Sequence, residues 1–234
     1  MTTDTKNATP VLDSEVVDFP NTEAALVPAT DSSFLTYGTA RPQALNLVRI
    51  GKPKSVEANH PEVEDCCFWR YPSADQPLYM PFRYPNGKPQ NKLNVQLVAI
   101  EETVVSYNDS PDATKLNLSV VDDTDPSADV LTITAGLGSN FAISVLQGLV
   151  TLTNNHPAQV PFTLSVSAKA TPKGKTHYAY VTVGNEWLKN DELFDRFQTL
   201  KNEAYELGAS PSSYKPLLSL CRELVAQIAT ALPQ

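Results

Sequence analysis

Lysines and tyrosines gather in one short stretch of the chain, KATPKGKTHYAYVTV. Lys169, Lys173 and Lys175 surround a glycine at the tip of a predicted β-hairpin. Tyr178 and Tyr180 follow on one face of its second strand. A single strand of nucleic acid offers phosphates to cations and base faces to aromatic rings. These residue types at this spacing therefore predict a binding surface for single-stranded nucleic acid.

Each half of this pattern has a plainer interpretation, which the sequence leaves open. The three lysines are also what a solvated hairpin tip carries. Tyrosines on the outer face of a strand also raise its β propensity, or pack under a neighbouring helix.

A second stretch, CCFWRYPSADQPLYMPFRYPNGKP, interleaves aromatic rings with basic side chains. Such a density of rings and guanidinium groups suits stacking and cation–π contact with bases, although core packing competes for the same rings. We expect Phe68 and Phe82 to pack inward, and Trp69, Arg70, Arg83 and Tyr84 to be exposed. The predicted contact residues of this stretch are Trp69, Arg70, Tyr71, Arg83, Tyr84 and Lys88.

Charge is distributed unevenly along the 234 residues. The whole chain has a net charge of −8, yet residues 41–92 and 161–185 each carry +3. The acidic total argues against a protein coated in positive charge, such as a histone-like duplex binder. A net negative charge of the whole chain does not exclude a local basic groove.

The elements that must position these residues follow from hydrophobic periodicity. Strict alternation in KLNVQLVAI, TKLNLSVV, PFTLSVSAKA and HYAYVTV predicts half-buried strands, and VLTITAG adds another. The phase slips near Val98 to Ile100, as a bulge requires. SNFAISVLQGLV predicts a short helix capped by Ser139 or Asn140. Asn86-Gly87 and Lys173-Gly174-Lys175 predict turns.

This order of three strands, a short helix and a two-strand hairpin resembles an oligonucleotide/oligosaccharide-binding (OB) fold. The stretch KATPKGKTHYAYVTV is similar to hairpins of single-stranded DNA-binding proteins. The resemblance covers residues 93–185 and implies a five-stranded OB barrel that binds DNA rather than RNA, in replication or recombination. Bacterial proteins of that class end in an acidic tail that recruits partners, whereas this chain ends in VAQIATALPQ. That recruiting role is therefore not carried over.

The C-terminal segment is helical by pattern. Apolar residues recur at helical spacing before Gly208, which is placed to end one helix, and again from Leu217 to Leu232. Burial within the chain is the interpretation we favour for this wide stripe, and self-association into a homo-oligomer is the alternative.

Four segments follow: a flexible acidic arm (1–32), a proline-rich, aromatic and basic β extension (33–92), an OB-fold core (93–185) and a C-terminal helical segment (186–234). The fold class is mainly β with C-terminal helices (α+β).

Enzymatic chemistry finds no motif: the P-loop, GxSxG and HExxH patterns are absent from the sequence. The acidic run DDTDPSAD lacks calcium-loop spacing, so we expect a solvated turn, no metal and no cofactor. The three cysteines are Cys66, Cys67 and Cys221, and their spacing fits neither a disulfide framework nor a zinc site. With no signal-peptide pattern and no bilayer-length apolar run, we expect a cytoplasmic, non-catalytic binder of single-stranded DNA, or of RNA, without a membrane partner. A structural or adaptor module of viral or mobile-element origin is the alternative.

Overall fold

The computed structural model describes residues 46–53, 68–73, 77–107, 110–123, 129–157, 159–172 and 174–233. All of them belong to the second of two compact units, Ser32–Gln234. The predicted acidic arm, Cys66, Cys67 and Lys173 lie outside the described residues.

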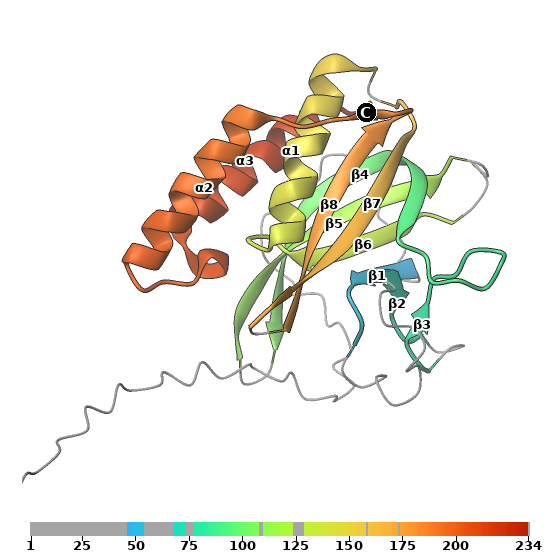
Figure 1. The fold of residues 1–234 in the computed structure, drawn as a ribbon, viewed down its shortest axis with the longest axis horizontal. Helices are drawn as coiled ribbons and strands as arrows, with labels where there is room; N and C mark the ends of the chain where they lie inside the picture. Colours follow the sequence, from blue (N-terminus) through green and yellow to red (C-terminus); the bar gives the residue numbers. More distant parts are fainter. Residues whose placement is uncertain are drawn as a thin grey trace, which may run out of the picture. The chain divides into compact units, whose positions relative to one another are not determined.

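Nine strands of the described residues form one sheet, in the order β3-β2-β1-β6-β5-β4-β7-β8-β9 (Figure 1). The strands are β1 (Leu47–Ile50), β2 (Phe68–Arg70), β3 (Met80–Pro81), β4 (Lys92–Tyr107), β5 (Ser110–Asp122), β6 (Leu131–Gly136), β7 (Phe162–Thr171), β8 (Gly174–Val183) and β9 (Glu186–Trp187). Every pairing is antiparallel except that of β1 with β6. The mixed α+β, mainly β class is confirmed.

The core lies on one face of the central strands because apolar residues alternate there with polar ones. Leu116, Leu118 and Val120 of β5 are buried, as are Leu164 and Val166 of β7. The predicted bulge in β4 is confirmed by a shift of register between Leu97 and Ala99. It moves the inward positions from odd to even residues, so Ile100 is buried after Leu93, Val95 and Leu97, whereas Val104 beyond it is 57 % exposed.

Three helices cover this core: α1 (Asn140–Asn155), α2 (Asp191–Glu206) and α3 (Lys215–Ala231), with a short 3₁₀ turn, η3 (Pro211–Ser213), before α3. Figure 1 shows α1 lying along β8, with α3 and α2 beyond it. The contact of α1 with β8 is close, since a Cβ atom at Gly148 would lie 2.6 Å from Cγ2 of Val181. Only glycine allows the helix to approach so closely.

The helix ends follow their sequence signals. Ser139 is the N-cap of α1, and its Oγ accepts a hydrogen bond from the Ala142 N–H. Gly208, at φ +67°, follows the end of α2 as predicted. The stripe of α3 is buried in the core, from Leu217 to Ile228, which confirms burial within the chain for that helix.

The closed five-stranded OB barrel is wrong, because the sheet is open. Among the described residues, the strand that we expected third in the barrel, β6, has β1 as its parallel neighbour instead of a closing strand. The edge of β8 that faces away from β7 is covered by α1 and by β9 with the residue that follows it. The Ala179 N–H donates to Ser144 Oγ of α1 at 2.7 Å, and the Leu188 N–H donates to the Val181 carbonyl oxygen at 2.9 Å. With these backbone groups satisfied, the edge needs no closing partner.

Two of the predicted element boundaries differ from those in the structure. Glu186 and Trp187, assigned to the helical segment, form β9 and extend the sheet beyond β8. The hairpin turn begins one residue early, because Thr171 already pairs with Gly174. The Asn86-Gly87 turn is confirmed: the Gly87 N–H donates to the Tyr84 carbonyl oxygen, and Gly87 has φ +78°.

Candidate nucleic-acid interface

The hairpin of β7 and β8 presents one polar, aromatic face to solvent. We call this surface the hairpin face; its residues are Thr163, Ser165, Ser167 and Lys169 of β7 and Thr176, Tyr178, Tyr180 and Thr182 of β8. They share one side of the sheet because residues paired across antiparallel strands point the same way. Tyr180 is 37 % exposed, Tyr178 is half-buried and Lys169 is exposed. The predicted alternation of β8, with Ala179 and Val181 inward, is confirmed.

Neighbouring strands extend this face on both sides. Trp187 of β9 pairs with Thr182 and is 54 % exposed, and its ring centroid lies 5.6 Å from that of Tyr180. On the other side, Lys92 of β4 pairs with Ser165, and Asn94 of β4 accepts a hydrogen bond from the Thr163 hydroxyl at 2.8 Å.

We call Tyr178, Tyr180 and Trp187 the aromatic platform. Its flanking lysines are Lys92 and Lys169, and the residues that make up the extended face include no Asp or Glu. A surface with two exposed cations and three accessible rings has the chemistry that a single strand of nucleic acid requires. Asp123 borders it beyond Asn94, since the Asp123 N–H donates to the Asn94 carbonyl oxygen. Sequence reasoning missed Trp187 and Lys92, because only the pairings with β8 and β7 bring them to this face.

The predicted lysines of the hairpin divide between its two faces. Lys169 lies on the hairpin face, whereas Lys175 shares the opposite face of β8 with His177. Burial, followed by the charges of Lys175 and Arg49, lowers the pKa of His177. Lys175 and Lys169 are both exposed, but they lie on opposite faces of the hairpin.

Trp69 is not an exposed stacking residue, which corrects our expectation. Its side chain is fully buried, and so is that of Phe68, which points to the opposite face of β2. β2 lies between β1 and β3, and Trp69 stands in a cross-strand row between Arg49 and Pro81. Both faces of this short strand are covered, so the ring offers no surface to a base. Inward packing is confirmed for Phe68 and for Phe82, which packs against the core.

The other predicted residues of this region pack against one another. The Arg70 guanidinium lies 5.0 Å from the centroid of the Phe82 ring, and Arg70 is exposed as expected. Tyr71 is half-buried beside Tyr79, with 5.4 Å between ring centroids. This cluster is a packed aromatic corner; of its predicted contact residues, Arg70 is exposed and Tyr71 is half-buried.

Arg83, Tyr84 and Lys88 belong to the turn that follows β3. Arg83 is exposed and its Nη1 donates to the Gly87 carbonyl oxygen at 2.8 Å. Tyr84 is half-buried rather than exposed, and its hydroxyl donates to Asn91 Oδ1 at 3.2 Å. Lys88 is exposed. The Asn91 carbonyl oxygen accepts a hydrogen bond from the Val166 N–H of β7, so this turn lies beside β7 and close to Lys92.

A basic cluster that sequence reasoning missed lies where β1 approaches β8. Gly51 directly follows β1, and a Cβ atom there would lie 2.5 Å from Cε1 of His177. Arg49, two residues earlier, lowers the pKa of His177 and, after burial, that of Lys115 on β5. The sequence signal for this cluster is weak. ALNLVRI contains a strand of only four residues, and nothing in it indicates which distant strands it pairs with.

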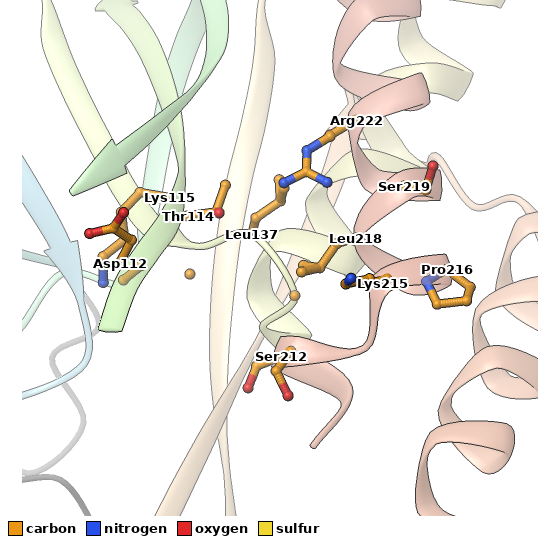
Figure 2. A pocket seen from close by; sticks show the side chains of 14 residues that line it. Asp112, Thr114, Lys115, Leu137, Ser212, Lys215, Pro216, Leu218, Ser219 and Arg222 are labelled. Carbon is orange, nitrogen blue, oxygen red and sulfur yellow. The ribbon is translucent and has the colours of Figure 1, made fainter. Parts of the chain in front are cut away.

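A cleft of about 800 Å³ opens beside Lys115, between the start of β5 and the start of α3 (Figure 2). Figure 2 shows Asp112, Thr114 and Lys115 on one wall and Ser212, Lys215, Leu218 and Arg222 on the other. Arg222 is paired with Glu102 at 2.8 Å, so its charge is partly compensated. Hydroxyls and lysines stand on both walls, although apolar atoms contribute more of the lining surface.

The part of the chain that the structure describes offers few groups for metal or redox chemistry. No group of three His, Cys, Asp or Glu side chains there is close enough to hold a metal ion. Burial raises the pKa of the Cys221 thiol to about 12, so this free cysteine is a packing residue rather than a nucleophile. In the same described ranges, no helix has the length and apolarity needed to span a bilayer.

Comparison with protein-family models, with curated proteins and with solved structures finds no match to this chain. The fold and site therefore define the class directly: a mixed α+β protein with an open, mainly antiparallel sheet that carries an aromatic and basic outer face.

Proposed function

We propose that this protein binds single-stranded nucleic acid, DNA in the first place, on the hairpin face and without catalysis. The observation that carries the proposal is the aromatic platform: Tyr178, Tyr180 and Trp187 on adjacent strands, with Lys169 and Lys92 on the side of β7 and β4 and no Asp or Glu among the residues named for the extended face. The preference for DNA rests on the resemblance of residues 93–185 to single-stranded DNA-binding proteins. The order of elements from β4 to β8 keeps that resemblance, although the sheet is open.

Binding begins with electrostatic capture. Lys169 and Lys92 stand on either side of the serine and threonine hydroxyls of β7, and they are exposed. Each phosphate that a lysine neutralises releases a counterion, so affinity falls as salt rises. The hydroxyls of Ser165 and Ser167 offer neutral donors to phosphate oxygens between the two cations.

Stacking then supplies the larger part of the affinity. Each base stacked on an aromatic ring contributes about 1–3 kcal/mol, and every base has a face to stack. The platform therefore binds with little sequence preference. Duplex DNA hides its base faces, and the net charge of −8 repels its denser phosphates, so a single strand is preferred.

The test is fluorescence anisotropy of a labelled ~30-nucleotide single strand at several salt concentrations, with duplex DNA and RNA of the same sequence as competitors. We expect wild-type binding to resist duplex and to weaken with salt. Tyr178→Ala with Tyr180→Ala should weaken binding by about 30-fold or more, since two stacked bases are lost. Lys169→Ala should reduce the slope of log affinity against log salt by about 0.7.

The matched controls lie on α2. Tyr205 is 64 % exposed and Arg196 is exposed, so Tyr205→Ala and Arg196→Ala remove an accessible ring and a cation away from the hairpin face. Both controls should bind like the wild type. Absence of binding at low salt, or an equal loss in the α2 controls, would refute the proposal.

A structural or adaptor role is the second proposal, and α2 is the feature that favours it. Phe194 is 50 % exposed and Leu207, just after the helix, is 72 % exposed. The partner that we propose is a second copy of this chain, in line with the self-association expected of the C-terminal helices. Sedimentation velocity across a range of concentrations tests it: a dimer that Leu207→Ser abolishes supports self-association, and a monomer throughout removes it. A cytoplasmic location stays a prediction.

A further inference from the structure

Two basic side chains face the same space across β6. Arg49 of β1 pairs with Thr134 of β6, and Lys115 of β5 pairs with Gly136 of the same strand. All four residues point to one side of the sheet because of this register. Gly136 leaves the space between the two cations open: a Cβ atom there would have its nearest neighbour, Ser139 Cβ, at 4.0 Å.

A third basic group reaches this space from β8. The His177 ring lies directly on Gly51, two residues after Arg49, with Nε2 and Nδ1 at 3.1 and 3.2 Å from the position of a Cβ atom. Glycine at this position, with φ +85°, is what lets the ring come so close to β1.

Arg49 repels both Lys115 and His177, and no ion pair with a carboxylate compensates any of the three groups within the described residues. Burial lowers the pKa of both Lys115 and His177, and Arg49 lowers each of them further. The Nε atom of Arg49 is buried and has no hydrogen-bond partner in the described part of the chain. The guanidinium lies 5.6 Å from the Tyr79 ring centroid, a contact that leaves this N–H unsatisfied.

Other charged groups surround Arg49, Lys115 and His177. Lys175 acts on His177 from its own strand. On the side of α1, Lys201 donates to Asn140 Oδ1, and Asn140 donates to the Thr176 hydroxyl next to His177. Asp112 shares the wall of the cleft with Lys115, and Glu101 accepts a hydrogen bond from Asn117. The causes that lower the pKa of Lys115 are burial and Arg49.

We infer that Arg49, Lys115 and His177 form a binding site for a phosphate group. A buried, unpaired guanidinium N–H is costly, and a tetrahedral anion with several acceptor oxygens satisfies it together with an ammonium and an imidazolium. Arginine is the side chain best suited to phosphate oxygens. Lys115 and Gly136 also line the cleft of about 800 Å³, so the site is next to an open space on the side of Lys115. The inference does not rest on the proposed function, because the site lies on the opposite face of β8 from the aromatic platform.

Phosphate binding and protonation of His177 are coupled. A bound anion favours the imidazolium, so it raises the pKa of His177 from its lowered value in the free protein. For an anion of fixed charge, affinity therefore increases as pH falls, and it decreases as pH rises through the pKa of His177 in the bound state.

The experiment follows the side-chain ¹⁵N signals of the histidines in the full chain while inorganic phosphate is added at constant ionic strength, with chloride as the matched salt. We expect saturable shifts at His177 and a rise of its pKa, whereas His156, at the end of α1, serves as internal control and should not respond. Arg49→Gln and Lys115→Gln should each weaken phosphate binding by about 10-fold or more. Arg196→Gln on α2 should leave it unchanged. Thermal unfolding of each variant checks that the fold is intact, and Arg49→Lys should bind between the two extremes.

A second arm distinguishes the source of the phosphate. An oligonucleotide is compared with a methylphosphonate strand of the same sequence, which keeps the bases and lacks the backbone charge. If the normal strand shifts His177 and the neutral strand does not, the site holds a backbone phosphate. If inorganic phosphate alone shifts it, the site takes a free phosphate or phosphomonoester. No response of His177 to either overturns the inference, and anisotropy at the aromatic platform then decides the proposed function separately.

Discussion

Alternate residues of β8 meet two different surroundings. Tyr178 and Tyr180 point to solvent beside Trp187, among hydroxyls and lysines. His177, between Thr176 and Tyr178 in sequence, points instead to Gly51 and the Arg49 guanidinium. The face with the two tyrosines is open to solvent. The face with His177 is crowded and basic, and the lowered pKa of His177 makes it sensitive to pH.

The difference shows how one strand can serve two kinds of contact. A strand reverses its side chains at each residue, so the neighbours of a site in sequence are not its neighbours in space. Rings on the open face can stack on bases without any change in packing. Cations on the crowded face are already desolvated, so an anion gains more there than at a hydrated surface lysine.

The largest expected effect is on the crowded face. Gly51→Val should destabilise the protein by about 2–4 kcal/mol, because the new Cβ meets the His177 ring and φ +85° strains any side chain. Gly87→Val is the matched control, since Gly87 has φ +78° and a Cβ atom there meets nothing within 4 Å. Urea unfolding measures both. Equal losses in the two variants would mean that the contact with His177 costs nothing.

On the open face, the next effect concerns binding rather than folding. Trp187→Ala should weaken single-strand affinity by about 1–3 kcal/mol, the contribution of one stacked base. Its unfolding midpoint should stay close to that of the wild type, because the ring is 54 % exposed. Base stacking should also quench the tryptophan emission of the wild type. Since Trp69 is fully buried, Trp187→Phe should abolish that quenching, and persistent quenching would place the strand elsewhere.

The covering of the β8 edge allows a third test. Ser144→Ala removes the hydroxyl that accepts the Ala179 N–H, and we expect a loss of about 1–3 kcal/mol because that backbone group is left unsatisfied. Ser167→Ala on the hairpin face should change the free energy of unfolding by less than about 0.5 kcal/mol. If both variants are neutral in urea unfolding, water replaces the serine at this edge.

The smallest effect is the pH dependence of stability. The pKa of His177 is lowered in the folded protein below its ordinary value of 6.5, so the unfolded chain binds a proton that the folded chain lacks. Stability should therefore rise with pH from the folded pKa up to about 6.5 and level off above it. His177→Gln should flatten this part of the profile, as measured by thermal unfolding between pH 5 and 8. An unchanged slope would assign it to other groups.

Local features of the fold were predictable because their cause lies within a few residues. Alternation in β5, β7 and β8 placed Leu116, Leu164 and Val181 inward, and each of them is buried. Ser139 and Gly208 marked helix ends through hydrogen bonding and backbone conformation that act over three or four residues. The hairpin face was predicted for the same reason, since its two strands are neighbours in the chain.

Trp69, β9 and the open sheet were not predictable in this way. Trp69 is buried because β2 lies between β1 and β3, strands of only four and two residues whose pairing no periodicity shows. β9 has two residues, and it carries Trp187 to the platform only because it folds back on β8.

By itself, then, the sequence determined which residues of each strand face solvent, because side-chain direction alternates with a period of two. It determined the basic and aromatic character of the hairpin in the same way. Only the tertiary structure decided that β6 would accept β1, and so brought Arg49, Lys115 and His177, which are far apart in the chain, to one place. The reason is physical: the pairing of strand edges depends on backbone hydrogen bonds that every residue offers alike, so the partner is selected by the packing of the whole sheet.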